Sequence, residues 1–224
     1  MNNEFITFCL NNLDWGILES GTLQEYSYPS LSLCAVDAVF SINTKYEAVK
    51  NIIGRIENLA YLNSLNSFSQ WLSNNSVENL NKNYFNNQIV AGRLKIEILK
   101  DFIKVLKDHN FLEKKDFKNF ITNEKIDQDL DYIRGIGDTT ISYFFMLAGD
   151  KNKIKPDRHI KKFISDRLKI SLNIIDNKRA IRELELILPD LQKKYPNLTL
   201  RNFDHLIWRF QRHLPKNTKA KIIK

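Results

Sequence analysis

Two glycines one residue apart, Gly135 and Gly137, are the residues whose spacing first suggests chemistry, in a chain of 224 residues with only seven glycines. Helical apolar spacing precedes them and resumes after them, so "IRGIGDTT" predicts a tight turn between two helices. The first amides of the second helix would be unpaired there, and glycine lets the backbone approach a ligand closely. We therefore expect an anion site. The alternative is a glycine that simply ends a helix in the left-handed conformation.

The residues of this turn fit contact with a phosphate rather than recognition of a base sequence. Ile136 can anchor the turn in the core, and a helix N-terminus binds a phosphate without reading a base. The expected contact residues are Arg134, Gly135, Ile136, Gly137, Asp138, Thr139 and Thr140.

An isolated acidic residue, Asp157, follows about twenty residues later in "KPDRHI". Pro156 restricts the backbone in front of it. A carboxylate in this place can accept a proton from an attacking water or stabilise a developing positive charge. An Asp at the start of a helix can also cap that helix, so a capping role is the structural alternative.

The excess of basic residues favours a polyanionic partner. The formal net charge is +8, and proteins that bind nucleic acids need Lys and Arg to displace counterions from phosphates. Solvated helix faces and a frayed terminus would give the same composition, so the net charge alone does not show that the protein binds nucleic acid. The basic residues concentrate in the stretches 100–118, 151–162 and 212–224.

Composition argues against several other classes of protein. Two cysteines, Cys9 and Cys34, cannot build a disulfide framework, and four histidines without close Cys, Asp or Glu partners offer no zinc spacing. The sequence has no uncharged apolar run of membrane-spanning length, and its N-terminus lacks the basic residues of a signal peptide. We expect a soluble intracellular protein without membrane contact.

Hydrophobic spacing is helical almost throughout, and strict alternation with β-branched bias is missing, so the chain is predicted to be all-α. The segment 30–42 is apolar on nearly every face, as a central buried helix is. The Asn/Ser-rich stretch 63–87 is interpreted as a short helix around Trp71 between loops. One bundle and two lobes that share a cleft both fit this pattern. Further helices are expected at 45–62, 92–110, 115–121, 125–133, 138–149, from 157, at 177–195 and at 200–214.

The glycine turn followed by Asp157 resembles the helix-hairpin-helix DNA glycosylase superfamily. The signature of that superfamily is Leu-x-Gly-x-Gly-x-x-Thr-Ala, followed by a Gly/Pro-rich loop and an Asp in Val-Asp-x-His-Val. Weaker similarity extends from about Tyr28 to Phe210, through "AVFSINTKYEAVKNIIGRI", "GRLKIEILKDFIKVLKDHN" and "FDHLIWRF". The residues that match the signature are Ile133, Gly135, Gly137 and Thr140, and then Pro156, Asp157, His159 and Ile160.

This resemblance implies two helical lobes with a DNA-binding cleft between them. One lobe would span 30–148 and end in the helix-hairpin-helix motif, and the other would combine 1–29 with 149–224 and carry Asp157. A target base would be flipped out of duplex DNA, and Asp157 would assist hydrolysis of its N-glycosidic bond. DNA contacts are expected from Asn43, from the turn residues named above, and from Lys153, Lys155, Arg158 and His159.

Thr139 stands where bifunctional members of the superfamily carry a lysine that forms a Schiff base with the sugar. We therefore expect a monofunctional enzyme that leaves an uncleaved abasic site. A displaced lysine nucleophile, Lys153 or Lys155, is the alternative, although phosphate contact or a solvated loop fits these residues better. The four C-terminal cysteines of cluster-bearing relatives are missing, so no iron-sulfur cluster is expected. A monovalent cation at the hairpin backbone is the one cofactor that the resemblance allows.

A flipped base needs a pocket with a stacking surface and a polar contact. Tyr28 and Trp208 are expected to line it, each with burial in a core as the alternative. Asp37 lies in an otherwise apolar helix and is expected to accept a hydrogen bond from the base; a buried Arg partner or a solvent-facing helix end are the alternatives. Arg134 replaces the usual Pro of the hairpin and Asn43 the usual Gln, which leaves the identity of the base open. Further aromatic candidates are Tyr26, Tyr61 and Trp71.

The expected partner is double-stranded DNA that contains a damaged or modified base, and the protein is expected to be a cytoplasmic monomer. Repair of DNA and defence against modified phage DNA both fit. Two other classes stay open. One is a non-catalytic DNA-binding module that retains the hairpin, and the other is an all-α protein-interaction scaffold without DNA affinity.

Overall fold

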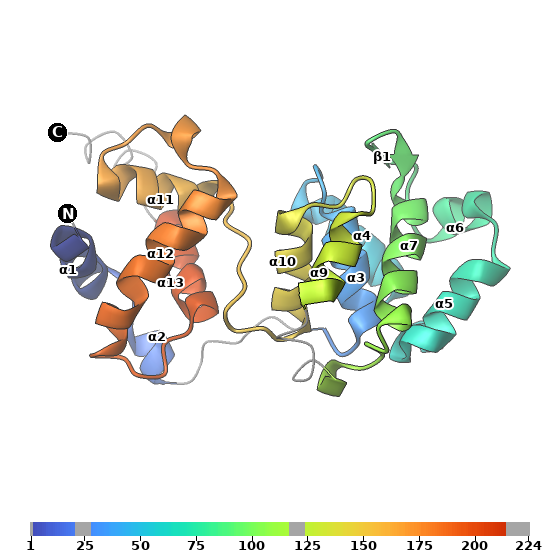
Figure 1. Ribbon diagram of the computed structural model, residues 1–224, viewed down its shortest axis with the longest axis horizontal. Helices are drawn as coiled ribbons and strands as arrows, with labels where there is room; N and C mark the ends of the chain where they lie inside the picture. Colours follow the sequence, from blue (N-terminus) through green and yellow to red (C-terminus); the bar gives the residue numbers. More distant parts are fainter. Residues whose placement is uncertain (1, 21–27, 117–123, 214–224) are drawn as a thin grey trace. The chain divides into compact units, whose positions relative to one another are not determined.

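The computed structural model describes residues 2–20, 28–116 and 124–213, which are predominantly helical (Figure 1). The prediction of an all-α chain is confirmed. The chain divides into two compact units: the central unit is Tyr26–Asp150, and the terminal unit combines Met1–Glu25 with Lys151–Lys224. Within the described ranges, no helix has the length and apolar character needed to cross a lipid bilayer. Tyr26 and most of the expected helix at 115–121 lie outside the described residues.

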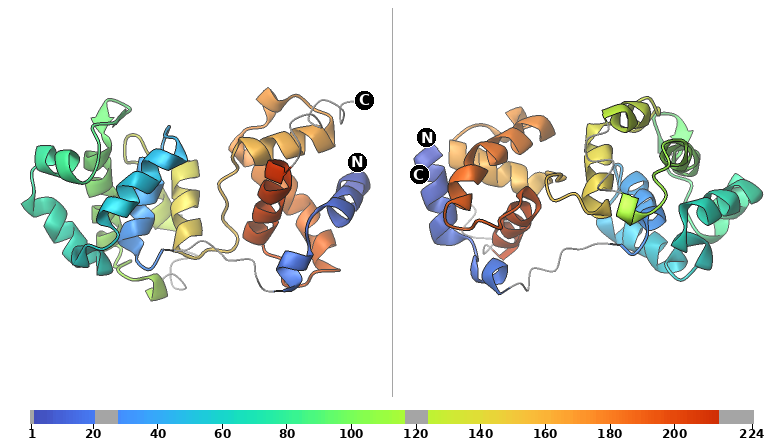
Figure 2. Two further views of the ribbon diagram at one scale, coloured as in Figure 1. Left: turned by 180° about the vertical axis from the view of Figure 1, so that it is seen from behind. Right: turned by 60° about the horizontal axis from the view of Figure 1, so that its bottom comes forward.

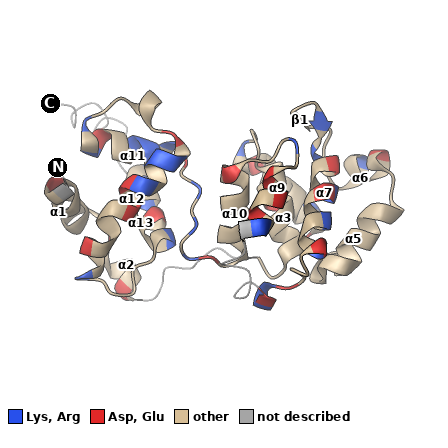
Figure 3. Cartoon of the chain, viewed as in Figure 1, with Lys and Arg blue, Asp and Glu red and all other residues tan. Residues whose placement is uncertain are grey.

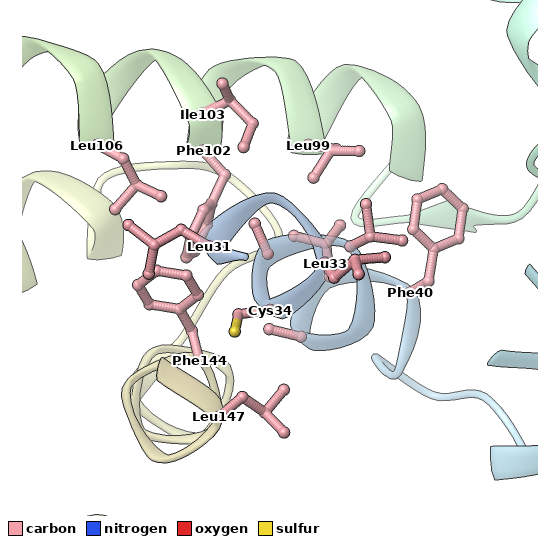
Figure 4. Packing of buried hydrophobic residues seen from close by; sticks show 14 of the residues in the cluster. Leu31, Leu33, Cys34, Phe40, Leu99, Phe102, Ile103, Leu106, Phe144 and Leu147 are labelled. Atoms are coloured by element: carbon pink, nitrogen blue, oxygen red, sulfur yellow. The ribbon is translucent and has the colours of Figure 1, made fainter. Parts of the chain in front are cut away.

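Helix α3 (Leu31–Phe40) forms the centre of the central unit. The Oγ of Ser30 accepts the amide of Leu33 at 3.4 Å and so caps the helix, all of whose residues are buried. Helices α7 (Lys95–Asp108) and α10 (Asp138–Ala148) pack against it. Figure 4 shows how apolar side chains of these three helices meet in one core, among them Leu31, Leu33, Leu99, Phe102, Phe144 and Leu147.

The segment expected as one helix at 45–62 forms two. Helix α4 (Tyr46–Ile56) buries an apolar stripe. Leu59 then has extended backbone, with φ −75° and ψ 123°, and the chain continues as the 3-10 helix η1 (Ala60–Asn63). The apolar spacing was right, but it does not reveal the extended residue that divides the segment.

The Asn/Ser-rich stretch contains two helices where one was expected, α5 (Leu65–Asn74) and α6 (Val77–Asn83). The second begins at Ser76, whose Oγ accepts the amide of Asn79 at 3.2 Å. The Asn79 side chain also donates to Asn75 at 2.9 Å. A cap and side-chain amide contacts therefore support helix in a composition that favours loops.

A small β-hairpin stands where the sequence was expected to begin a helix at 92. Strand β1 (Ile89–Val90) pairs antiparallel with β2 (Arg93–Leu94). The two turn residues, Ala91 and Gly92, have φ values of 51° and 80°, as a two-residue hairpin turn requires. Only then does α7 begin.

The terminal unit builds its core from both ends of the chain (Figure 2). Helix α1 (Asn2–Asn12) packs against α12 (Asn177–Gln192), and α11 (Arg158–Leu168) packs against α13 (Leu200–His213). The shorter elements of the two units are α2 (Gly16–Glu19), η2 (Lys114–Asp116), α9 (Glu124–Asp131) and η3 (Leu172–Ile174).

Candidate nucleic-acid interface and catalytic site

The turn between α9 and α10 is held by close contacts around Gly135. The amide of Ile136 donates to the carbonyl of Ile133 at 2.9 Å, and Gly135 has a φ of 102°. A Cβ atom on Gly135 would lie 2.8 Å from Cδ1 of Ile98. The positive φ therefore favours glycine at this position, and a larger residue would also have to displace the end of the Ile98 side chain.

Gly137 is the N-cap residue of α10, and its role is different. Its backbone is extended, with φ −154° and ψ 172°, a conformation open to any residue. No side chain caps the helix at this residue, and a Cβ atom on Gly137 would meet no heavy atom within 4 Å. Glycine provides open space beside a helix N-terminus here, which is what the backbone needs in order to approach an anion closely.

The other residues of the turn surround the same helix start. Arg134 and Asp138 are exposed, whereas Thr139 and Thr140 are partly buried. Ile136 is also partly buried and packs against the core of the central unit. The turn is therefore anchored by an apolar side chain and presents a charged and polar surface.

The β1–β2 hairpin lies directly against this turn. The Cγ1 atom of Val90 is 3.4 Å from the position that a Cβ on Gly135 would take. A guanidinium nitrogen of Arg134 is 3.5 Å from the corresponding position on Gly92. Two glycine-containing turns from distant parts of the sequence therefore form one continuous surface.

Asn43 lies in the turn that follows α3, exposed and with a φ of 51°. This turn is held by Lys95, a residue that the sequence analysis did not single out. The buried Lys95 ammonium donates to the carbonyls of Phe40 at 2.9 Å and Ile42 at 2.5 Å, and to Oγ1 of Thr44 at 2.5 Å. A cation at the C-terminal end of a helix satisfies carbonyls that lack helical partners. Lys95 therefore holds the backbone before Asn43 and the Thr44 side chain after it.

Asp37 is fully buried and is bound by hydroxyl groups of its own unit. Tyr28 donates to Oδ2 at 2.7 Å, and Ser41 donates to Oδ1 at 2.8 Å. Burial raises the pKa of Tyr143, and Asp37, to which its hydroxyl is hydrogen-bonded, raises that pKa further. Among the described residues its hydrogen-bond partners are hydroxyl groups and not an Arg, and the side chain is buried rather than solvent-facing. Tyr28 and Asp37 do lie together, but inside the core and in contact with each other.

Asp157 is the N-cap residue of α11 in the terminal unit. Its Oδ1 accepts the amides of His159 at 2.7 Å and Ile160 at 3.1 Å. In the described part of the chain, no hydrogen-bond donor contacts its Oδ2. The residue is partly exposed and follows the buried Pro156. The cap therefore fixes the carboxyl group through one oxygen and leaves the other oxygen available.

Basic residues flank Asp157 on both sides. Lys153 and Lys155 are partly buried in the non-helical segment before α11, where Figure 3 shows the basic positions in blue. After Asp157, Arg158 is exposed and His159 is partly buried. A positively charged neighbourhood of this kind suits a polyanionic ligand.

Asp204, which had no predicted role, lies in α13 close to Asp157. The Oδ1 of Asp204 is buried and has no hydrogen-bond partner among the described residues. Burial raises the pKa of Asp204 well above its usual value, the neighbouring Asp157 raises it further, and Arg201 lowers it. In the sequence, Asp204 is an acidic residue in the apolar pattern of "FDHLIWRF".

Trp208 lies one helical turn after Asp204 on α13 and is partly buried. The guanidinium carbon of Arg212 lies 4.5 Å from the centre of its ring, and the ring of His205 is 5.9 Å away. Burial lowers the pKa of His205, as do the nearby Arg209 and Arg201. Trp208 thus packs on the terminal core with cationic or polar groups around it.

The expected site residues fall into two groups. The central unit holds Tyr28, Asp37, Asn43 and the turn at 134–140, and the terminal unit holds Asp157, its basic neighbours and Trp208. In the part of the chain that the structure describes, no three His, Cys, Asp or Glu side chains lie close enough together to bind one metal ion.

One family model, described as a domain of unknown function (DUF8548), matches residues 12–212. The comparison with curated proteins gave no match, and the comparison with solved structures gave none either. The matched range includes most of both units and the whole of the candidate site. The chain therefore belongs to the DUF8548 family.

Proposed function

We propose that this protein is a monofunctional DNA glycosylase, which hydrolyses the N-glycosidic bond of a damaged or modified base and leaves an abasic site. The observation that carries the proposal is the state of Asp157. Its carboxyl group is oriented by two backbone amides through Oδ1, is partly exposed, and has basic residues on both sides. Such a group is fixed in direction and still able to react.

The reaction needs a carboxylate beside the sugar. As the bond between C1′ and the base breaks, its electron pair leaves with the base, and positive charge develops on the sugar. A water oxygen then bonds to C1′, and its proton passes to Asp157. The negative charge of Asp157 stabilises the same transition state electrostatically.

The turn between α9 and α10 would serve as the helix-hairpin-helix grip on the DNA backbone. Gly135 sets the shape of the turn, and Gly137 leaves open space at the start of α10, where a phosphate can accept amide hydrogen bonds. In this proposal the central unit provides the grip and the terminal unit provides Asp157. Arg134, Lys153 and Lys155 would add phosphate contacts.

Thr139 supports the monofunctional form of the proposal. It occupies the second position of α10, where bifunctional members of the resembled superfamily carry the lysine that forms a Schiff base with the sugar. A glycosylase that uses water would release the base and leave the strand intact. Strand breaks should then appear only after alkali or heat, and borohydride should trap no covalent complex.

The test is base release from a panel of duplex oligonucleotides. The panel would contain uracil, hypoxanthine, 8-oxoguanine, 7-methylguanine and 1,N6-ethenoadenine, together with hypermodified phage DNA, and mass spectrometry would identify the released bases. We expect one class of base to be released by the wild-type protein. No release from any member of the panel would contradict the proposal. The substrate would also separate repair of damaged DNA from defence against phage.

A second candidate function is favoured by the same residue. Asp157 caps α11, which is a sufficient structural reason for an Asp at this position. A non-catalytic DNA-binding module would therefore keep both the cap and the turn. Salt-dependent binding to duplex DNA without base release from any substrate would support that module.

A further inference from the structure

A second carboxyl group, that of Asp204, accompanies Asp157 in the terminal unit. Asp157 is the N-cap residue of α11, and α11 packs against α13, which carries Asp204 in its second turn (Figure 1). The two carboxyl groups are close enough for the charge of Asp157 to act on Asp204. Two residues far apart in the sequence thus form one acidic pair.

Each member of this pair keeps one oxygen without a protein donor. The Oδ1 of Asp204 is buried and unpartnered among the described residues, and in the same part of the chain Oδ2 of Asp157 receives no hydrogen bond. Buried polar atoms in proteins nearly always have a hydrogen-bond partner, which is a water or a ligand where the protein supplies none. Two carboxyl oxygens in this state can share one water molecule.

The environment of Asp204 favours its protonated form. Burial and Asp157 both raise the pKa of Asp204, and only Arg201, from its own helix, acts in the opposite direction within the described chain. Two carboxyl groups that interact in a site of low polarity favour a state with one proton between them. Asp204, whose pKa is raised, is the member that favours the protonated state.

We propose that Asp204 is a second catalytic residue, whose carboxyl group and that of Asp157 hold the attacking water between them. This inference rests on the proposed glycosylase function. The water oxygen bonds to C1′, the electron pair of the N-glycosidic bond leaves with the base, and the water proton passes to Asp157. Asp204 keeps its own proton throughout and fixes the direction of the attack.

The test is single-turnover base release, measured as a function of pH with the duplex from the panel above that reacts fastest. Asp204→Ala should lower the rate about 100-fold, as expected when a reacting group is misplaced. Asp204→Asn keeps a hydrogen-bonding side chain that cannot titrate. It should retain a rate within about tenfold of the wild type and lose the fall in rate at alkaline pH. Asp190→Asn, which removes a carboxyl group on α12, should match the wild type.

If Asp204 had only a structural role, the rate of base release by Asp204→Asn would depend on pH in the same way as that of the wild type. The inference is overturned if Asp204→Asn keeps the alkaline fall, or if a folded Asp204→Ala has the wild-type rate. Should Asp204→Ala fail to fold, the pH profile of the isosteric Asp204→Asn decides. A wild-type protein that releases no base overturns the proposed function and this inference together. Base release that is insensitive to Asp204 overturns the inference alone.

Discussion

The side chain of Ile98 occupies the space into which any side chain at Gly135 would extend, since a Cβ atom there would lie 2.8 Å from Cδ1 of Ile98. Helix α7 therefore determines the shape of the turn between α9 and α10. Gly137, two residues later, meets no comparable constraint. The two glycines that looked equivalent in the sequence differ in what they do.

Gly135→Ala should destabilise the protein because it forces a side chain into a left-handed φ and into Ile98. We expect a loss of about 1–3 kcal/mol in the free energy of unfolding. Gly137→Ala is the matched control and should change that free energy by less than about 0.5 kcal/mol. Urea unfolding followed by circular dichroism would measure both. Equal losses for the two variants would contradict the assignment.

Gly137→Ala should nevertheless weaken the binding of duplex DNA, because the added methyl group stands in the open space at the start of α10. The expected loss is about tenfold in affinity for a duplex with a tetrahydrofuran abasic-site analogue, as expected when a backbone hydrogen bond to phosphate is lost. Fluorescence anisotropy would measure it. Unchanged affinity in a stable Gly137→Ala variant would place the phosphate contact elsewhere.

The glycine pair shows which features of the turn can be predicted from the sequence and which cannot. Local spacing was enough to predict a turn between two helices, because helical periodicity and glycine are both local signals. It could not show which glycine is indispensable. That property depends on Ile98 and Val90, which reach the turn only through the tertiary packing of α7 and the β-hairpin.

Lys95→Met should be among the most destabilising single substitutions in the central unit. It keeps the aliphatic stem but removes the ammonium group that donates to the carbonyls of Phe40 and Ile42. We expect a loss of about 3 kcal/mol in the free energy of unfolding. Lys104→Met, at an exposed position of the same helix, is the control and should have little effect. A Lys95→Met protein as stable as this control would show that the buried ammonium is dispensable.

Lys95 and Asp37 mark a second limit of sequence analysis. Asp37 could be identified as unusual because a carboxylate interrupts an apolar helix, but its hydroxyl partners, among them Tyr28, could not be predicted. The burial of Lys95 could not be predicted, since a lysine at the start of an amphipathic helix is usually a solvated residue. Both depend on which backbone and side-chain groups meet in the folded core.

Asp204 should make the protein less stable as the pH rises. Because its pKa is higher in the folded than in the unfolded state, the folded protein binds the additional proton between about pH 4 and the folded pKa. Stability due to this group is present at low pH and is lost across that interval. The Asn side chain of Asp204→Asn does not titrate, so this variant does not lose stability in this way. Its free energy of unfolding, relative to that of the wild type, should therefore increase as the pH rises. Thermal unfolding from pH 4 to pH 8 would measure it, with Asp190→Asn as control. A difference that does not change with pH would contradict the assignment.

Arg134→Ala should weaken DNA binding in a salt-dependent manner. Arg134 is exposed beside the turn, so its proposed contact is with a phosphate. Loss of one phosphate contact lowers the slope of log K against log salt concentration by about 0.9. Lys82→Ala, on α6, is the control for charge alone. Titrations at several salt concentrations would compare the two slopes, and an equal change in both would assign the effect to net charge.

The central claim concerns Asp157, and Asp157→Asn tests it most directly. Asn caps a helix nearly as well as Asp, so the start of α11 should remain intact and only the carboxylate chemistry is removed. We predict that this variant binds the abasic-site duplex with wild-type affinity and that single-turnover base release falls by at least about 100-fold. Base release at the wild-type rate by a folded Asp157→Asn protein would contradict the account.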